Sequence, residues 1–245
     1  MNIFLAASMK SGSTHIKNSF VRLGFKPASV HTTLPGCVNE DSRVDMGAAS
    51  VLFPLGGMVF HHHIRAIGPN AKILDMFDVK PIVLVRNVLD SVVSWKESMD
   101  FDVENGLGNY NSHSSVYGAQ WKWMNEHEKY QWILYNVVPW YFSFFLSWKN
   151  CFKPIPMFHF YEDHFKNEAE GIHKILKHSD TPEFTLPPSA IEKCIGSQDG
   201  KFNKGILGRG DDLPRDFKRQ VQEQAYSWGP NEGRILEEQL LCRRH

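Results

Sequence analysis

The feature that most restricts the fold is a run of four large apolar residues, Ile-Val-Leu-Val at 82–85, followed at once by polar Arg86. A strand that is buried on one face alternates apolar and polar side chains. This run does not alternate, which is typical of a parallel strand covered on both faces. Residues 89–99 then have the pattern of a helix. A buried strand leading into a helix predicts a parallel sheet with helices on both faces.

The same succession of strand and helix recurs along the chain. Strands are also expected at 3–8, 57–64 and 155–163, and further helices at about 14–23, 163–178 and from 214. We interpret the aromatic stretch 132–148 as buried helix or as the wall of a substrate pocket. We expect one α/β domain over residues 1–245, with a central parallel β-sheet and with ligands beyond the carboxyl ends of its strands.

The balance of charge narrows the class of partner. Lysine plus arginine and aspartate plus glutamate both total 27, so no net field attracts nucleic acid or an anionic membrane. No apolar stretch reaches the roughly 18 residues of a membrane span, and the first apolar run is too short for a secretory signal. The cysteines form no Cys-x-x-Cys pair, which disfavours zinc and a disulfide framework. We therefore expect a cytoplasmic protein without a membrane span.

A candidate anion site follows the first expected strand, in the sequence Met-Lys-Ser-Gly-Ser-Thr. Glycine and small residues at the start of a helix let backbone N–H groups converge where the helix dipole favours negative charge. Lys10 adds a positive charge, and Ser11, Ser13 and Thr14 add donors. The Gly-Lys-Ser/Thr order of P-loop NTPases is absent. The alternative is an ordinary turn in which Ser11 or Ser13 is the N-cap.

A second candidate lies where the 82–85 strand ends. Ser94 follows Arg86 by eight residues and is expected one turn inside the next helix. An arginine fork and a hydroxyl that converge from a strand end and a helix suit a phosphate dianion. Alternatively, Arg86 pairs with Asp90.

Taken together, these two stretches resemble the motifs of sulfotransferases that use 3′-phosphoadenosine-5′-phosphosulfate (PAPS) and release 3′-phosphoadenosine-5′-phosphate (PAP). The resemblance covers residues 3 to about 212 and implies a P-loop-NTPase-like sulfotransferase fold. The residues that match the first motif, and would surround the 5′-phosphosulfate, are Lys10, Ser11, Gly12, Ser13 and Thr14. The residues that match the second motif are Arg86, Asn87, Asp90 and Ser94, of which Arg86 and Ser94 would hold the 3′-phosphate.

Two weaker matches add to the expected nucleotide site. The sequence Phe-Asn-Lys-Gly-Ile-Leu-Gly resembles the family's late loop over the nucleotide; Lys204 and Gly205 match it, and Asn203 stands where an arginine is usual. In Phe-Tyr-Glu-Asp, the resemblance places Tyr161 at a strand end near the adenine. His15 stands where the family usually has a tryptophan that stacks on the adenine.

The catalytic candidates include a run of three histidines at the end of the expected strand 57–64. Because strand side chains alternate, His61 and His63 share one face and His62 points away, which disfavours a metal site. The resemblance places the general base at His63, with His61 near the sulfate, assisting or exchanging roles with it. Lys10 would stabilise charge on the leaving group. No metal is expected.

The expected reaction is sulfuryl transfer from PAPS to a hydroxyl group of a small molecule, a lipid or a carbohydrate. Two alternatives stay open. A P-loop kinase or NTPase would need Mg-ATP and is disfavoured by the position of Lys10. A catalytically inactive PAP-binding protein is disfavoured by the intact set of candidate residues. The sequence predicts neither the acceptor nor the oligomeric state.

Overall fold

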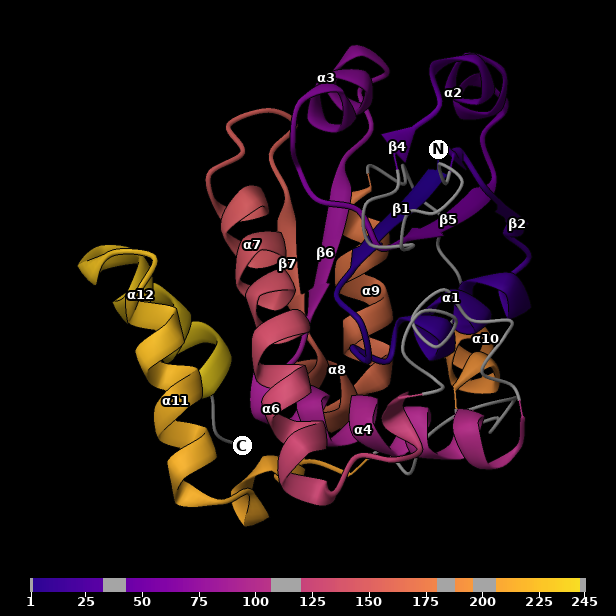
Figure 1. The fold of residues 1–245 in the computed structure, drawn as a ribbon. Helices are drawn as coiled ribbons and strands as arrows, with labels where there is room; N and C mark the ends of the chain where they lie inside the picture. Colours follow the sequence, from indigo (N-terminus) through magenta and orange to yellow (C-terminus); the bar gives the residue numbers. More distant parts are fainter. Residues whose placement is uncertain (1, 33–42, 107–119, 180–187, 196–205, 243–245) are drawn as a thin grey trace.

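The protein is represented by a computed structural model that describes residues 2–32, 43–106, 120–179, 188–195 and 206–242. At its centre is a five-stranded sheet in the order β2-β5-β1-β6-β7, in which each neighbouring pair is parallel (Figure 1). Its strands are β1 (Asn2–Ala7), β2 (Lys26–Ala28), β5 (Met58–His62), β6 (Pro81–Val85) and β7 (Met157–Phe160). A separate antiparallel pair consists of β3 (His31–Thr32) and β4 (Arg43–Val44). The predicted α/β fold with a parallel sheet is confirmed.

Helices connect these strands and flank the sheet. Those before β7 are α1 (Ser13–Arg22), α2 (Met46–Leu52), α3 (Pro69–Met76), α4 (Val88–Glu104), α6 (Glu126–Asn136) and α7 (Val138–Lys149). Those after it are α8 (Tyr161–Lys166), α9 (Glu168–His178), α10 (Pro188–Cys194), α11 (Arg215–Tyr226) and α12 (Pro230–Leu236). The short helical turns are η2 (Phe53–Leu55), η4 (Arg209–Asp212) and η5 (Glu237–Leu241). None of the described helices has the length and apolar character needed to cross a membrane.

The sheet is buried on both faces, and β1 shows how. Ile3 and Leu5 pack in one cluster with residues of α1, α9 and α10. Phe4 and Ala6 point the other way, into a larger cluster formed with α4, α6, α7 and α11. All five residues of β6 are buried, as expected for its unbroken apolar run. Alternate side chains of each central strand therefore supply two separate cores.

Several boundaries differ from the sequence expectations, each for a local reason. The expected strand 155–163 ends at Phe160, because α8 begins at Tyr161. The helix expected at 89–99 runs from Val88 to Glu104, and Asn87 caps it by accepting from two N–H groups of its first turn. The stretch 132–148 forms the end of α6 and most of α7, which confirms the interpretation as buried helix. Strand β2 and helix α3 were not predicted.

The topology brings three chain segments to one edge of the sheet. β5 and β6 lie on opposite sides of β1, so the chain crosses from one side of β1 to the other between them. Ligands of open α/β sheets bind beside such a crossover, beyond the carboxyl ends of the strands. The loop after β1, the histidines that end β5 and the arginine after β6 all lie at this edge, which α4 crosses in Figure 1.

Candidate functional site

The loop between β1 and α1 has the backbone geometry of an anion cradle. Gly12 is the N-cap of α1, with φ 73°, and makes no side-chain capping bond. The Ser11 hydroxyl donates instead to the Ser8 carbonyl at 2.6 Å, and Ser13 is already the first residue of the helix. Neither serine is therefore the N-cap. Lys10 has a left-handed backbone, φ 60°, which costs a residue with a Cβ about 1–2 kcal/mol.

Three hydrogen bonds join this loop to other parts of the chain. The Ser8 N–H donates to the Leu84 carbonyl of β6 at 2.8 Å. The Tyr141 hydroxyl of α7 donates to the Met9 carbonyl at 3.0 Å. The Arg86 guanidinium donates from Nη1 to the Lys10 carbonyl at 3.3 Å. The rigid surroundings therefore hold Lys10 in its costly conformation, a pattern that is concentrated at functional sites.

Gly12 lies directly against two aromatic rings of α8. A Cβ at this position would come within 2.8 Å of the Tyr161 ring and 2.9 Å of the Phe165 ring. The two rings contact each other with centroids 4.3 Å apart. The backbone at the start of α1 therefore packs directly against the aromatic rings of α8 and leaves no room for a side chain at position 12.

Gly12→Ala is expected to destabilise the fold by more than its left-handed backbone explains. Gly24→Ala is the matched control, because Gly24 also has a positive φ, 97°, but nothing within 4 Å of the added methyl group. Gly24→Ala should cost about 1–2 kcal/mol, and Gly12→Ala a further 1–3 kcal/mol, roughly, for overpacking against the rings. Denaturant unfolding measures both. Equal losses would show that the ring contact yields without cost.

Arg86 is buried, with 3% exposure, and its guanidinium is surrounded by the chain. Nη2 donates to the Ile206 carbonyl at 2.9 Å and lies 3.5 Å from a carboxylate oxygen of Asp90. The guanidinium carbon lies 4.1 Å from the centre of the Tyr161 ring. The Arg86–Asp90 pair considered from the sequence is therefore present, together with the contact to the Lys10 loop. Arg86 Nε is buried without a partner among the described residues.

The side chains of His61 and His63 lie on one face of the strand and that of His62 on the other, as the strand pattern predicts. His61 Nε2 lies 2.8 Å from the Ser13 hydroxyl, and His63 Nδ1 donates to the Ala7 carbonyl at 2.8 Å. The two rings are 5.2 Å apart between centroids. His62 points to the opposite face, where its Nε2 accepts from the Val30 N–H at 3.4 Å. Burial, reinforced by His63, holds the pKa of His61 well below its usual range.

The bond from His63 Nδ1 determines what this ring can do. Neutral imidazole carries one N–H, and the carbonyl of Ala7 can only accept, so the proton is on Nδ1. The lone pair is then on Nε2, which is the atom a general base needs.

Of the remaining predicted site residues, the structure describes Ser94, Thr14 and His15. Ser94 is buried on α4, and Thr14 is exposed on the first turn of α1. His15 Nε2 pairs with a Glu168 carboxylate oxygen at 3.0 Å, and its ring lies beside Phe165, 5.4 Å between centroids. Asn203, Lys204 and Gly205 lie outside the described residues.

Sequence reasoning assigned no binding or catalytic role to four residues around this site, all on α4, α8 or α9. They are Asp90, Glu162, Phe165 and Glu168. Asp90 was matched to a motif but given no role beyond a pairing with Arg86. Tyr161 and Phe165 are four residues apart, a helical spacing that would have linked them if residues 160–166 had been expected as helix.

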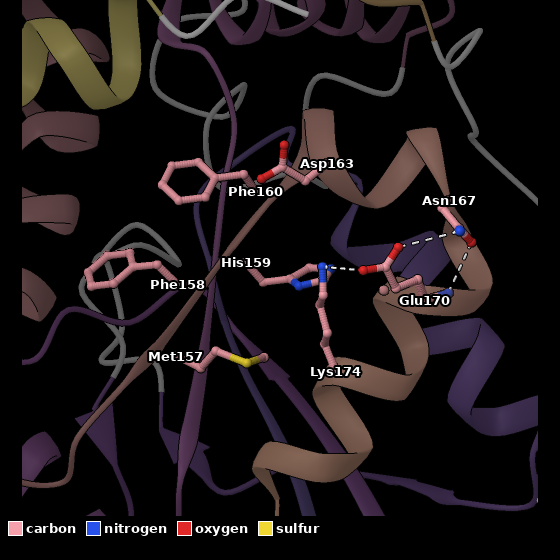
Figure 2. Close-up of a pocket in the computed structure, with 9 residues that line it drawn as sticks. Met157, Phe158, His159, Phe160, Asp163, Asn167, Glu170 and Lys174 are labelled. Atoms are coloured by element: carbon pink, nitrogen blue, oxygen red, sulfur yellow. Dashed lines mark hydrogen bonds and ion pairs between the residues drawn. The ribbon is translucent and has the colours of Figure 1, made fainter.

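A hollow of about 120 Å³ lies elsewhere, between β7 and helices α8 and α9 (Figure 2). It is lined by Met157, Phe158, His159, Phe160, Asp163, Asn167, Glu170, Gly171 and Lys174. Glu170 and Lys174 form an ion pair across 2.7 Å at its rim (Figure 2). None of the predicted site residues that the structure describes lines it.

The chain has a sulfotransferase-like α/β fold. The crystal structure of mouse sulfotransferase SULT7A1 complexed with PAP matches it with a TM-score of 0.64, over 97% of this chain and 87% of that chain. The two sequences are 17% identical, so the match establishes the fold. No family model and no curated protein matches this chain in sequence.

Proposed function

We propose that this protein is a PAPS-dependent sulfotransferase, which transfers the sulfuryl group of PAPS to a hydroxyl acceptor and releases PAP. One observation carries the proposal. Arg86 bonds to the carbonyl of Lys10 although 76 residues separate them in the chain, so the two candidate phosphate motifs meet. The fold shared with a PAP-bound sulfotransferase supports the same conclusion.

The donor would bind along this junction. The N–H groups at the start of α1 and the ammonium group of Lys10 suit the 5′-phosphosulfate, with Ser11, Ser13 and Thr14 beside them. Arg86, whose buried Nε has no partner among the described residues, and Ser94 on α4 suit the 3′-phosphate. We assign the adenine to the neighbourhood of His15 and Tyr161, and the closing contacts to Asn203, Lys204 and Gly205.

In the proposed reaction, His63 Nε2 takes the proton of the acceptor hydroxyl. The acceptor oxygen forms a bond to sulfur while the bond from sulfur to the 5′-phosphate oxygen breaks, and PAP leaves with the electron pair. Lys10 stabilises the charge that develops on the leaving oxygen. His61, bonded to Ser13 and held neutral by burial, orients the loop beside the sulfate and is the weaker candidate for the base. The acceptor is a hydroxyl of a small molecule, a lipid or a carbohydrate.

Lys10→Ala tests this assignment. Both residues carry a Cβ, so the backbone cost at φ 60° is the same and the variant should still fold. Loss of one charge at the leaving oxygen should lower kcat by about 10²–10³, the range for removing a single preorganised donor. The measurement is release of PAP from PAPS with mixed phenol, sterol and sugar acceptors.

Lys72→Ala is the matched control, because Lys72 is exposed on α3, away from the loop. A wild type that binds PAP but releases none from PAPS with any acceptor would point to the inactive binding protein. Equal turnover in wild type and Lys10→Ala would contradict the role of Lys10.

A further inference from the structure

A buried carboxylate ties the segment after residue 205 to the first turn of α4. Asp90 is 3% exposed, and each of its oxygens accepts one backbone N–H. The N–H of Gly210 donates to Oδ1 at 2.8 Å, and that of Gly208 donates to Oδ2 at 3.0 Å. Both bonds are charge-assisted, a class roughly twice as strong as neutral hydrogen bonds.

The packing at this contact leaves little room for the segment to shift. A Cβ on Gly210 would come within 2.4 Å of the Leu89 side chain and 2.9 Å of its carbonyl carbon. Gly208 has φ 75°, a conformation that other residues adopt at a cost. The segment therefore lies directly against α4, with its N–H groups aimed at one carboxylate.

The same carboxylate also faces the candidate phosphate arginine. Asp90 Oδ2 lies 3.5 Å from Arg86 Nη2, and that nitrogen also donates to the Ile206 carbonyl at 2.9 Å. Nη2 is thus held from two directions, by Asp90 itself and by the segment that Asp90 anchors. With Nη1 on the Lys10 carbonyl, the guanidinium is fixed in orientation, and Nε is its buried nitrogen without a described partner.

We infer that Asp90 is a positioning residue for nucleotide recognition: it sets the orientation of Arg86, directly and through residues 206–210, so that the site selects nucleotides with a 3′-phosphate. The inference rests on the proposed function. Asp90 would act by orienting Arg86 and not by attracting the nucleotide. A negative charge beside the 3′-phosphate would by itself weaken binding. The orientation it imposes on Arg86 must outweigh that repulsion.

Asp90→Asn tests the inference with almost no change in shape. The amide has one accepting oxygen, so one glycine N–H loses its acceptor, and Arg86 loses its ionic partner. The affinity for PAP should fall about tenfold or more, while the affinity for 5′-AMP, which lacks the 3′-phosphate, should change less than about twofold. Calorimetric titration with both nucleotides gives the PAP to 5′-AMP affinity ratio.

Glu97→Gln is the matched control. Glu97 is also on α4 and pairs with Arg209, so it anchors the same segment through another arginine. Its ratio should equal that of the wild type. A purely structural role for Asp90 would lower thermal stability and leave the ratio unchanged, and this outcome would overturn the inference. An unchanged or increased affinity of Asp90→Asn for PAP would also overturn the inference.

Amide hydrogen exchange of the wild type covers the case in which Asp90→Asn does not fold. The N–H groups of Gly208 and Gly210 should exchange slowly, and PAP should slow them further while 5′-AMP does not. Equal effects of the two nucleotides would overturn the inference while leaving the proposed function standing. If the wild type binds no PAP, both the inference and the proposed function are contradicted.

Discussion

His63→Ala is expected to lower kcat for sulfuryl transfer by about 10²–10⁴ and to leave PAP binding within a factor of about two, because general bases contribute on this scale. The reason lies in the orientation of the ring. Its Nδ1 donates to the Ala7 carbonyl, so the lone pair of the neutral ring is on Nε2, at the carboxyl edge of the sheet. The measurement is single-turnover release of PAP from labelled PAPS with acceptor present.

Two variants separate His63 from its neighbours. His61→Ala removes the contact to the Ser13 hydroxyl and should act on donor binding more than on kcat. His173→Ala, at an exposed position of α9, should act on neither. If His61→Ala loses kcat on the scale expected for His63→Ala, while His63→Ala retains it, the two histidines have the opposite roles.

Lowering the pH from 7 to 5 is expected to remove about 6 kcal/mol from the free energy of unfolding through three buried histidines. Burial, with smaller contributions from nearby positive charges, lowers the pKa of His62 to about 3, of His159 to about 4 and of His164 to about 3. These rings stay neutral in the folded protein, whereas in the unfolded chain they take up protons below the ordinary value of 6.5. Stability is therefore full above about pH 6.5 and is lost as the pH falls toward 4.

The size of this loss follows from proton linkage. Each ring contributes about 1.4 kcal/mol per pH unit inside that window, or about 2 kcal/mol at pH 5. The total is comparable with the whole stability of a marginal domain, about 5–15 kcal/mol. His159 lies at the hollow of Figure 2, between Lys174, which lowers its pKa, and Asp163, which raises it. Glu162 has the opposite effect on the pH dependence of stability. Burial raises the pKa of its carboxyl group, so the folded protein binds this proton more readily than the unfolded chain does.

Denaturant unfolding at half-unit steps from pH 7.5 to 4.5 measures the effect. The slope near pH 5 should include about three protons taken up on unfolding by His62, His159 and His164, with a further contribution from His61, whose pKa is also lowered by burial. His164→Asn should reduce the slope by about one proton, since it removes one of two rings joined by a 3.0 Å hydrogen bond. His173→Gln, at an exposed position of α9, is the matched control. A flat profile across this range would mean that the buried histidines titrate normally.

The sequence was most informative where a local pattern determined the structure. The apolar run at 82–85 predicted a strand buried on both faces, and the alternation of residues 61–63 correctly separated His62 from its neighbours. Strand β2 was missed because three residues containing Pro27, at the sheet edge, carry no such pattern. Local periodicity therefore identified the buried strands and failed at the edge.

Contacts between distant segments were not accessible from the sequence. That Tyr161 begins a helix, and that its ring packs on Gly12, depends on how α8 is placed against α1. The role of Asp90 depends on N–H groups about 120 residues away. His15, which stands where the family usually has a tryptophan that stacks on the adenine, has a carboxylate partner from α9 that no motif indicated.

The most direct test of the central claim is the thermal stability of the purified protein with PAP, with 5′-AMP and with Mg-ATP. With all three nucleotides at the same concentration, 100-fold above the Kd for PAP, PAP binding adds about 2.7 kcal/mol, which corresponds to a rise in Tm of roughly 5–10 °C for a chain of this size. The account predicts a large shift with PAP and a smaller one with 5′-AMP, because only PAP carries the 3′-phosphate assigned to Arg86 and Ser94. A shift with Mg-ATP and none with PAP would contradict it and favour a nucleotide kinase or NTPase.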